Sequence, residues 1–439
     1  MNKTDEARLE HLEIPSEITE LAKRLTRGAR EVLPSLRALQ LKLLKARQEG
    51  RKLRVKLGID PTGFDVHIGH GVPLRAMARF QEEGHEVQFL MGGATAQIGD
   101  PTGRDSARAM QTAEEAAQKC ATFVEQIRPL LPLKPENIFN NADWEHRFWE
   151  TFRLLSRRLT INPFLGKEAF ANRLDAGKPV SFIETFYPIM QGFDSVELHS
   201  DVEIGGTDQR FNLLMGRQLQ SMFDQEPQVV IMFDLLEGTD GVPVLNEDGS
   251  PAKTPEGKPR FRKMSKSFDN TINLKDSPND IVGKTMRLPD GLIERFFTLA
   301  TSVDSERLAS EAAFLAGGGN PRDAKVRLAH QLVLELHGQA AAEAALEFWH
   351  TVHTERGTPT DMPLCMVPPA TNLVSLIVEH GLAESKTKAR ALIKQGGVRL
   401  DDAKVTDEAH VINLAPDEKL VLKVGKQGKF LQLVGQPAA

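Results

Sequence analysis

The stretch LRVKLGIDPTGFDVHIGHG, residues 53–71, decides the fold class. Its first eight residues are typical of a short strand, and Asp60-Pro61-Thr62-Gly63 is a turn signal. A helical pattern runs from His67 to about Glu83, and the apolar stretch at 86–95 predicts a second strand. Strand, turn, helix and strand make the βαβ unit of a parallel sheet.

The same alternation continues along the chain. Residues 17–49 and 112–160 have helical patterns, and VVIMFDLL at 229–236 predicts another buried strand. These segments together predict an α/β fold with a Rossmann-type, doubly wound parallel sheet. In such a sheet the functional site lies at the carboxyl ends of the strands.

The rest of the sequence predicts additional parts. Residues 1–270 would form the sheet domain, and 271–355 a helical domain. A proline-rich linker at 356–370 would then lead to a small α+β domain at 371–433. This last segment carries 10 Lys and Arg against 8 Asp and Glu, in a chain whose net charge is −5. The basic end of an acidic protein favours contact with RNA.

Composition excludes several classes of protein. Cys120 and Cys365 are the only cysteines and have no paired spacing, which argues against a disulfide framework or a cysteine zinc site. The polar amino-terminal stretch has no apolar core of a secretion signal, and no segment is apolar for long enough to span a membrane. We therefore expect a soluble, cytoplasmic protein with no protein-bound metal.

His67 and His70 lie at the opening of the first predicted helix. Spaced three residues apart, they can face one side of the first turn, where the helix dipole and unpaired N–H groups attract phosphate. Gly69 between them leaves room for a flat base to pack on the backbone. Two surface histidines at a helix start would look the same, and nucleotidylyltransferases share this HxGH pattern. The motif indicates adenylyl-transfer chemistry and no particular enzyme.

Lys263-Met264-Ser265-Lys266-Ser267 follows a polar stretch at 239–262 that is typical of a long surface loop. Two lysines three apart on a flexible loop can close over a triphosphate and neutralise the departing pyrophosphate. A merely solubilising basic loop is the bland alternative. The pairing of HIGH with KMSKS on a Rossmann-type sheet makes the chain resemble class I aminoacyl-tRNA synthetases.

Three more motifs narrow the resemblance to one family. They are IGDPTGR at 98–104, YPIMQGFD at 187–194 and GGTDQ at 205–209. In this order they resemble bacterial tyrosyl-tRNA synthetases, from the first helix to the carboxyl-terminal tail. Tryptophanyl enzymes share HIGH and KMSKS but are not expected to carry the first two in this form. The only tyrosine of the chain, Tyr187, falls inside the second motif.

The resemblance implies a role for each motif residue. Asp100, Tyr187 and Gln191 would accept from the ammonium of tyrosine, Asp194 would accept from its phenol, and Gln209 would lie near its carboxylate. The nucleotide would contact Asp60, Gly69, Gly206, Asp208, Met264, Ser265 and Lys266. The residues implied in catalysis are Thr62, His67, His70, Arg104, Arg108, Lys263 and Lys266. An ordinary surface acid or helix cap is the alternative for Asp194.

Two features depart from the family pattern. Many members have a tyrosine in the first strand that offers a second contact to the phenol, and this chain has Lys56 there. Hydroxyl recognition could then rest on Asp194, on a water or on Lys56 itself. The segment from Val244 to Arg262, before KMSKS, is longer than usual and looks inserted.

The tail resembles the RNA-binding domain shared by an S-four-like ribosomal protein and tyrosyl enzymes. Lys386, Lys388, Arg390 and Lys394 fall on one short predicted helix, where they could pair with RNA phosphates. A solvated basic helix face is the alternative.

The implied activity is that of a tyrosine–tRNA ligase. Its substrates would be L-tyrosine, ATP with Mg²⁺ carried on the nucleotide, and tRNA(Tyr). Family members are homodimers, and residues 125–190 would form the interface, with residues 271–355 on the anticodon arm. A catalytically inactive RNA-binding paralogue, or a related ligase for another amino acid, would be separated from this reading by tyrosine-dependent ATP–pyrophosphate exchange.

Overall fold

The computed structural model describes residues 12–60, 65–100, 112–246, 248–254, 257, 259–353, 362–401, 403–425 and 429–436. By its internal contacts the chain divides into two compact units, Met1–Ala342 and Glu343–Ala439. The division falls within the last long helix, ahead of the proline-rich stretch. The domain boundaries expected from the sequence stay predictions.

A six-stranded sheet forms the centre of the first unit, in the order β1-β6-β5-β2-β3-β4. The strands are β1 Glu31–Leu33, β2 Arg54–Ile59, β3 Glu86–Met91, β4 Ile138–Asn140, β5 Val202–Gly206 and β6 Val229–Phe233. All neighbours pair in parallel except β1, which runs antiparallel to β6. The chain leaves β2 toward β3 on one side and later returns to β5 on its other side. This reversal is the switch point at which ligands bind in such sheets.

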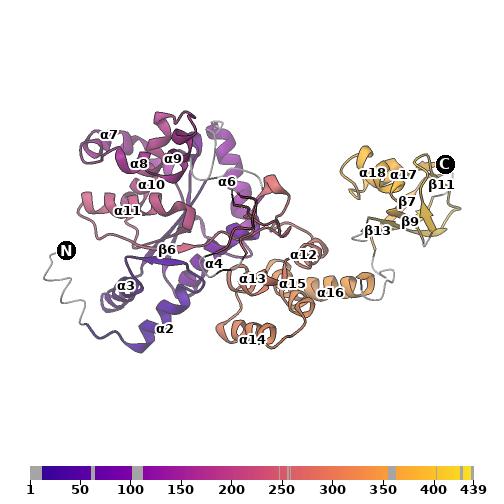
Figure 1. Ribbon diagram of the computed structural model, residues 1–439, viewed down its shortest axis with the longest axis horizontal. Helices are drawn as coiled ribbons and strands as arrows, with labels where there is room; N and C mark the ends of the chain where they lie inside the picture. Colours follow the sequence, from indigo (N-terminus) through magenta and orange to yellow (C-terminus); the bar gives the residue numbers. More distant parts are fainter. Residues whose placement is uncertain are drawn as a thin grey trace. The chain divides into compact units, whose positions relative to one another are not determined.

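The central strands are apolar because both faces of the sheet are covered. All five residues of β6 are buried, as are four of the five in β5. Helix α4 (Ile68–Glu82) packs against β2, β3 and β5, and α2 (Ser16–Leu25) packs on α4. Helices α10 (Phe186–Glu197) and α11 (Arg210–Met222) lie against each other on the other side of the sheet (Figure 1). The predicted doubly wound parallel sheet is confirmed.

Other helices complete the first unit. They are α3 Leu36–Gln48, α5 Thr95–Ile98, α6 Ala113–Ile127, α7 Glu145–Ser156, α8 Asn162–Leu165, α9 Glu168–Asp175, α12 Pro278–Thr285, α13 Ile293–Ala300, α14 Ser305–Ala316 and α15 Pro321–His337. Short 3₁₀ turns lie between them, at 135–137, 141–144, 182–185, 207–209, 266–268 and 290–292. Helix α16 (Gln339–His353) contains the division between the two units. Within the described part of the chain no helix is both long and apolar enough to cross a membrane.

The sequence prediction was wrong at two places in this unit. Residues 17–49 are not one helical stretch, because β1 interrupts them and pairs with β6. Helix α2 ends at Leu25, Gly28 follows at φ +77°, and the backbone of Arg30 then donates to Met232 on β6. The helical pattern at 112–160 is likewise broken, by strand β4 at the sheet edge. Both strands are three residues long, and their sheet partners are distant in sequence.

The second unit is a small α+β fold, as the sequence predicts. Its five-stranded sheet has the order β10-β9-β12-β13-β7, with a separate pair β8-β11. The strands are β7 Leu364–Val367, β8 Thr371–Asn372, β9 Val398–Leu400, β10 Ala403–Val405, β11 Val411–Ile412, β12 Lys419–Val424 and β13 Lys429–Gly435. Helices α17 (Leu373–Glu379) and α18 (Lys386–Lys394) pack on each other and share its apolar core.

Candidate active site

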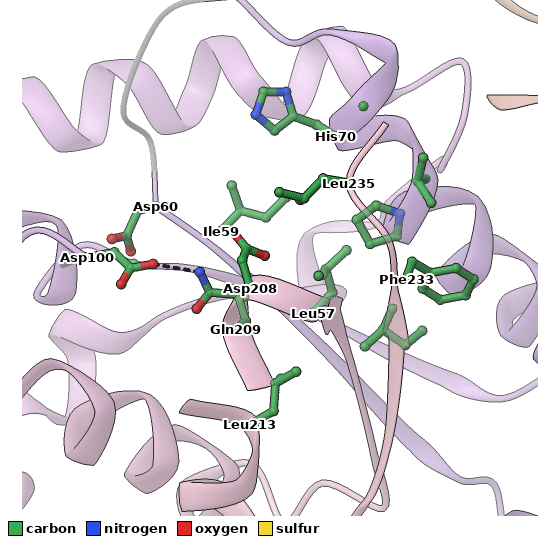
Figure 2. Close-up of a pocket in the computed structure, with 18 of the residues that line it drawn as sticks. Leu57, Ile59, Asp60, His70, Asp100, Asp208, Gln209, Leu213, Phe233 and Leu235 are labelled. Atoms are coloured by element: carbon green, nitrogen blue, oxygen red, sulfur yellow. Dashed lines mark hydrogen bonds between the residues drawn. The ribbon is translucent and has the colours of Figure 1, made fainter. Parts of the chain in front are cut away.

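A cavity of about 580 Å³ opens at the carboxyl ends of β2 and β5. Figure 2 shows side chains from β2, from β6, from α4, from the turn that follows β5 and from the start of α11 around it. Motif residues from five separate stretches of sequence line this one space. They are Asp60, His67, Gly69, His70, Asp100, Tyr187, Gln191, Asp194, Gly206, Asp208, Gln209, Lys263, Met264, Ser265 and Lys266. Thr62, Arg104 and Arg108 lie outside the described residues.

The two histidines stack at the start of α4. His67 precedes the helix, and the His70 Nδ1 accepts from its backbone N–H at 3.2 Å. A neutral His70 therefore carries its proton on Nε2, where it can donate. Burial, and after it the charge of Lys266, lowers the pKa of His70 to about 4. Burial and then His70 lower the pKa of His67 to about 2, so both rings are neutral donors at pH 7.

The glycine between the histidines is required by their packing. The two rings lie 3.8 Å apart, and a Cβ at Gly69 would come within 2.9 Å of the His67 ring. Gly69 also lines the cavity. Because it has no side chain, it leaves space both for the His67 ring and in the cavity.

Hydrogen bonds connect the KMSKS loop with the histidine motif. The backbone N–H of Ile68 donates to Ile272 at 2.9 Å, which ties the start of α4 to the segment that follows the loop. Asn270 is fully buried, and its side chain accepts from Ser265 N–H and donates to the carbonyl of Lys263. Burial lowers the pKa of Lys266, and its charge in turn adds to the effect of burial in lowering the pKa of both imidazoles. The loop thus lines the cavity, with the charge of Lys266 acting on both histidines and that of Lys263 on Asp208.

Asp60 is held at the end of β2 by two hydroxyl groups. Tyr187 donates to its Oδ2 at 2.9 Å and Thr95 to its Oδ1 at 2.8 Å. Burial, followed by the charge of Asp60, raises the pKa of Tyr187 well above its usual value. The Tyr187 oxygen therefore stays protonated and retains lone pairs for a donor in the cavity.

Asp194 is a buried acceptor at the inner end of the cavity. Its Oδ1 accepts from the indole of Trp144 at 2.9 Å, and its Oδ2 from the amide of Asn141 at 3.3 Å. Burial raises the pKa of Asp194 to about 7, against the opposing charge of Lys56 and these two hydrogen bonds. Each carboxylate oxygen can accept a further hydrogen bond. Asp194 is therefore neither a surface acid nor a helix cap.

Lys56 donates to protein atoms only. Its ammonium contacts Glu203 Oε1 at 2.9 Å, Ser195 Oγ at 2.7 Å and the carbonyl of Gln191 at 3.0 Å. An ammonium has three N–H bonds, and these acceptors use all three. Of the alternatives for the phenol, direct donation by Lys56 does not fit this geometry.

Family profiles and curated relatives match most of this chain. The family profile of class I tRNA synthetases for tryptophan and tyrosine matches residues 48–243 and 257–354, and that of the tyrosine–tRNA ligase carboxyl-terminal domain matches 354–431. The tyrosine–tRNA ligase of Moorella thermoacetica is 41% identical over 96% of this chain and 97% of its own. That of Thermotoga maritima is 39% identical over 88% and 91%. This chain belongs to the tyrosine–tRNA ligase family.

Solved structures show the same fold. A truncated mitochondrial tyrosyl-tRNA synthetase of Aspergillus nidulans has a TM-score of 0.59 at 24% identity and covers 79% of this chain and 99% of its own. The Archaeoglobus fulgidus enzyme, solved with L-tyrosine, has a TM-score of 0.56 at 21% identity, with 75% and 99% covered. At these identities the likeness establishes the fold of the ligase family and no further detail.

The stretch before KMSKS is extra relative to the family profile, which skips residues 244–256 inside the predicted insertion. Its described residues form an extended arm: the backbone N–H of Val244 donates to Arg260 at 2.9 Å, and that of Arg262 to Val242 at 2.9 Å. At its base the guanidinium of Arg262 pairs with Asp240 and lies 4.4 Å from the ring of Phe268.

The basic residues predicted to bind RNA are exposed on α18. Ala389 and Ile393 are buried on the opposite side of this helix. Lys388 pairs with Glu384, and Lys394 lies 2.7 Å from Glu408. RNA phosphates would therefore have to replace Glu384 and Glu408 as partners of these lysines. Exposed ion pairs contribute little free energy, so this exchange would cost little.

Sequence reasoning missed several residues that shape the site. They are Asn141, Trp144, Lys167, Glu203 and Asn212, which contact motif side chains from other elements. None belongs to a recognisable motif, so their partners could be found only in the folded chain.

Proposed function

We propose that this chain activates L-tyrosine with ATP and transfers it to the 3′ end of tRNA(Tyr). One observation carries the proposal: a buried, donor-held carboxylate, Asp194, closes the cavity into which both class I signature motifs face. A phenol hydroxyl can donate to one of the acceptor positions that remain on this carboxylate. Phenylalanine would leave it unpaired, at the cost of desolvating the carboxylate.

The tyrosine end of the cavity offers acceptors for an ammonium. Asp100, Tyr187 and Gln191 line it together, with oxygen atoms that suit a cationic donor. Gln209 also lines the cavity and donates to Asp100 at 2.6 Å. This hydrogen bond is the dashed line in Figure 2. We assign these four residues to the ammonium and carboxylate of tyrosine.

The nucleotide end is formed by the two signature motifs. Asp60, Gly69, Gly206, Asp208, Met264, Ser265 and Lys266 would hold ATP, which arrives with its Mg²⁺. The tyrosine carboxylate attacks the α-phosphorus, the bond to the β-phosphate oxygen breaks, and pyrophosphate leaves. Neutral His67 and His70 donate to phosphate oxygens, and Lys263 and Lys266 neutralise the charge that develops on the leaving group. Thr62, Arg104 and Arg108 stay proposed contacts of the phosphates.

The adenylate then reacts with the tRNA. A ribose hydroxyl at the tRNA 3′ end attacks the tyrosyl carbonyl, and AMP leaves with the electron pair of the mixed anhydride. No covalent bond to the protein forms, and positioning with charge stabilisation carries the rate. The helices at 271–355 and the basic residues of α18 would hold the tRNA, in the cytoplasm where translation uses the product.

Exposed apolar side chains support a homodimer. Among the described residues, seven of the fifteen exposed large apolar side chains lie at 149–183, inside the predicted interface at 125–190. They are Trp149, Leu154, Ile161, Leu165, Leu174, Phe182 and Ile183. Exposed large apolar side chains that are concentrated in one segment are typical of a protein–protein interface. Phe182, at 73% exposure, is the most exposed of them, so Phe182→Glu should dissociate the dimer in sedimentation velocity.

Charging of transcripts tests the whole reaction. Purified protein, ATP–Mg²⁺ and labelled tyrosine should give acid-precipitable label on tRNA(Tyr) and none on tRNA(Phe). Labelled phenylalanine should give none on either. Charging with another amino acid in place of tyrosine would overturn the proposal.

A further inference from the structure

Three amide side chains lie in a row behind the tyrosine end of the cavity. The amide nitrogen of Asn212 donates to Gln191 Oε1 at 3.0 Å and to Gln209 Oε1 at 2.8 Å. The Asn212 Oδ1 accepts from the ammonium of Lys167 at 3.0 Å. Lys167 and Asn212 are buried, and neither lines the cavity.

Each branch of this row ends at a charged group that can only donate or can only accept hydrogen bonds. Lys167 only donates, whereas the carboxylates of Asp100 and Glu203 only accept. Gln209 Nε2 donates to Asp100 at 2.6 Å, and Gln191 Nε2 to Glu203 at 3.4 Å.

These ends fix the orientation of all three amides. Because Lys167 must face an oxygen, Asn212 turns its nitrogen toward the two glutamines. Each glutamine must then turn its oxygen to Asn212 and its nitrogen to a carboxylate. Rotating any amide by 180° would oppose like groups at both of its ends.

Lys167 is held in place to start this chain of contacts. It precedes α9, and its ammonium lies 5.9 Å and 5.8 Å from the ring centres of Phe170 and Phe211. Asp100 Oδ1 is 3.9 Å from the same ammonium, so the charge is partly balanced inside the protein. Asn212 is 0% exposed, which leaves water little access to replace it.

We infer that Lys167 and Asn212 are positioning residues that orient Gln191 to accept from the α-ammonium of tyrosine and keep Gln209 in its contact with Asp100. This rests on the proposed function. With its amide so oriented, Gln191 Oε1 can accept one more hydrogen bond, and the ammonium is the donor that suits it. Asp194 is outside the row, so phenol recognition does not depend on it.

Asn212→Asp is the sharpest test, because it keeps the shape and the acceptor for Lys167 but removes both donated hydrogen bonds. A second variant, Lys167→Met with Asn212→Leu, removes the row without leaving an unpaired buried lysine. Asn246→Asp, at an exposed residue of the arm, is the matched control for the added charge. Melting temperatures verify folding, and unaltered protein must first show tyrosine-dependent exchange, so that failure of the proposed function is seen separately.

Two ligands distinguish positioning from general support. Both variants should raise the KM for tyrosine about 10- to 100-fold, the range for hydrogen bonds to charged groups. Inhibition by 3-(4-hydroxyphenyl)propionate, which has no ammonium, should change less than threefold, and so should the ratio of tyrosine to phenylalanine activation. If the variants weakened the binding of tyrosine and of 3-(4-hydroxyphenyl)propionate equally, the two residues would have a merely structural role. If neither ligand bound more weakly, they would have no role. Either result overturns the inference.

Discussion

The ammonium of Lys56 lies 2.9 Å from the carboxylate of Glu203, with the two side chains 0% and 1% exposed. This buried ion pair joins β2 to β5 directly beneath the tyrosine end of the cavity. Ser195 and the amide of Gln228 also donate to Glu203, so the carboxylate is surrounded by donors. Lys56 thus joins two strands of the sheet by a buried ion pair, at the position where the family resemblance led us to expect a tyrosine.

Replacing Lys56 alone should lower the free energy of unfolding more than replacing Lys56 and Glu203 together. Lys56→Met leaves Glu203 buried without its cation and should lower the free energy of unfolding by about 3–5 kcal/mol. Lys56→Met with Glu203→Gln removes both charges and should recover most of that loss. Lys388→Met, at an exposed ion pair with Glu384, should change less than about 1 kcal/mol. Urea unfolding measures all three, and equal losses in the single and double variants would contradict the account.

Tyrosine binding should weaken in mild acid. Burial raises the pKa of Asp194 to about 7, and a phenol donates better to its carboxylate than to its acid form. Tyrosine binding therefore favours the ionised form, and affinity should fall toward tenfold per pH unit below pH 7. His67 and His70 titrate near 2 and 4 and do not interfere. Equilibrium dialysis from pH 6 to 8 measures this, and an unchanging tyrosine Kd would contradict the assigned role of Asp194.

Removing the second lysine of KMSKS should separate binding from chemistry. Burial and the charge of Lys266 lower the pKa of both imidazoles of the HIGH motif, and we propose that the leaving pyrophosphate binds there. Lys266→Ala should slow adenylate formation by roughly 100-fold, since such groups act mainly in the transition state. Single-turnover rates and tyrosine Kd values measure the two effects. Comparable losses in both would count against this role.

The tail should contribute a salt-dependent part of tRNA affinity. Lys394 is exposed on α18 and would exchange its contact with Glu408 for a phosphate. Lys394→Ala should weaken binding of every RNA about equally and reduce the slope of log K against log salt by about one. Filter binding at several salt concentrations measures this. An unchanged slope would place α18 away from the RNA.

Local sequence was sufficient for the parts of the site that have short-range signatures. His67 and His70 share one helical turn, and Lys263 and Lys266 share one loop, so spacing alone indicated their chemistry. Parallel strands then bring their carboxyl ends together, which is why these motifs meet in one cavity.

Other features depended on contacts that no single stretch of sequence records. Strand β1 is three residues long, and only its pairing with β6 makes it a strand. The motif identifies Asp194, which lies on α10. Its donors Trp144 and Asn141 come from the 3₁₀ turn at 141–144. Lys56 was noticed as a departure, yet its role could not be read until its three acceptors were known.

ATP–pyrophosphate exchange is the most direct test of the central claim, that this cavity activates tyrosine by reading its phenol. Purified protein should exchange label between pyrophosphate and ATP when L-tyrosine is added, and far less with L-phenylalanine or L-tryptophan. Asp194→Ala should remove most of the difference between tyrosine and phenylalanine. A folded protein that shows no tyrosine-dependent exchange, or equal exchange with phenylalanine, would contradict the account.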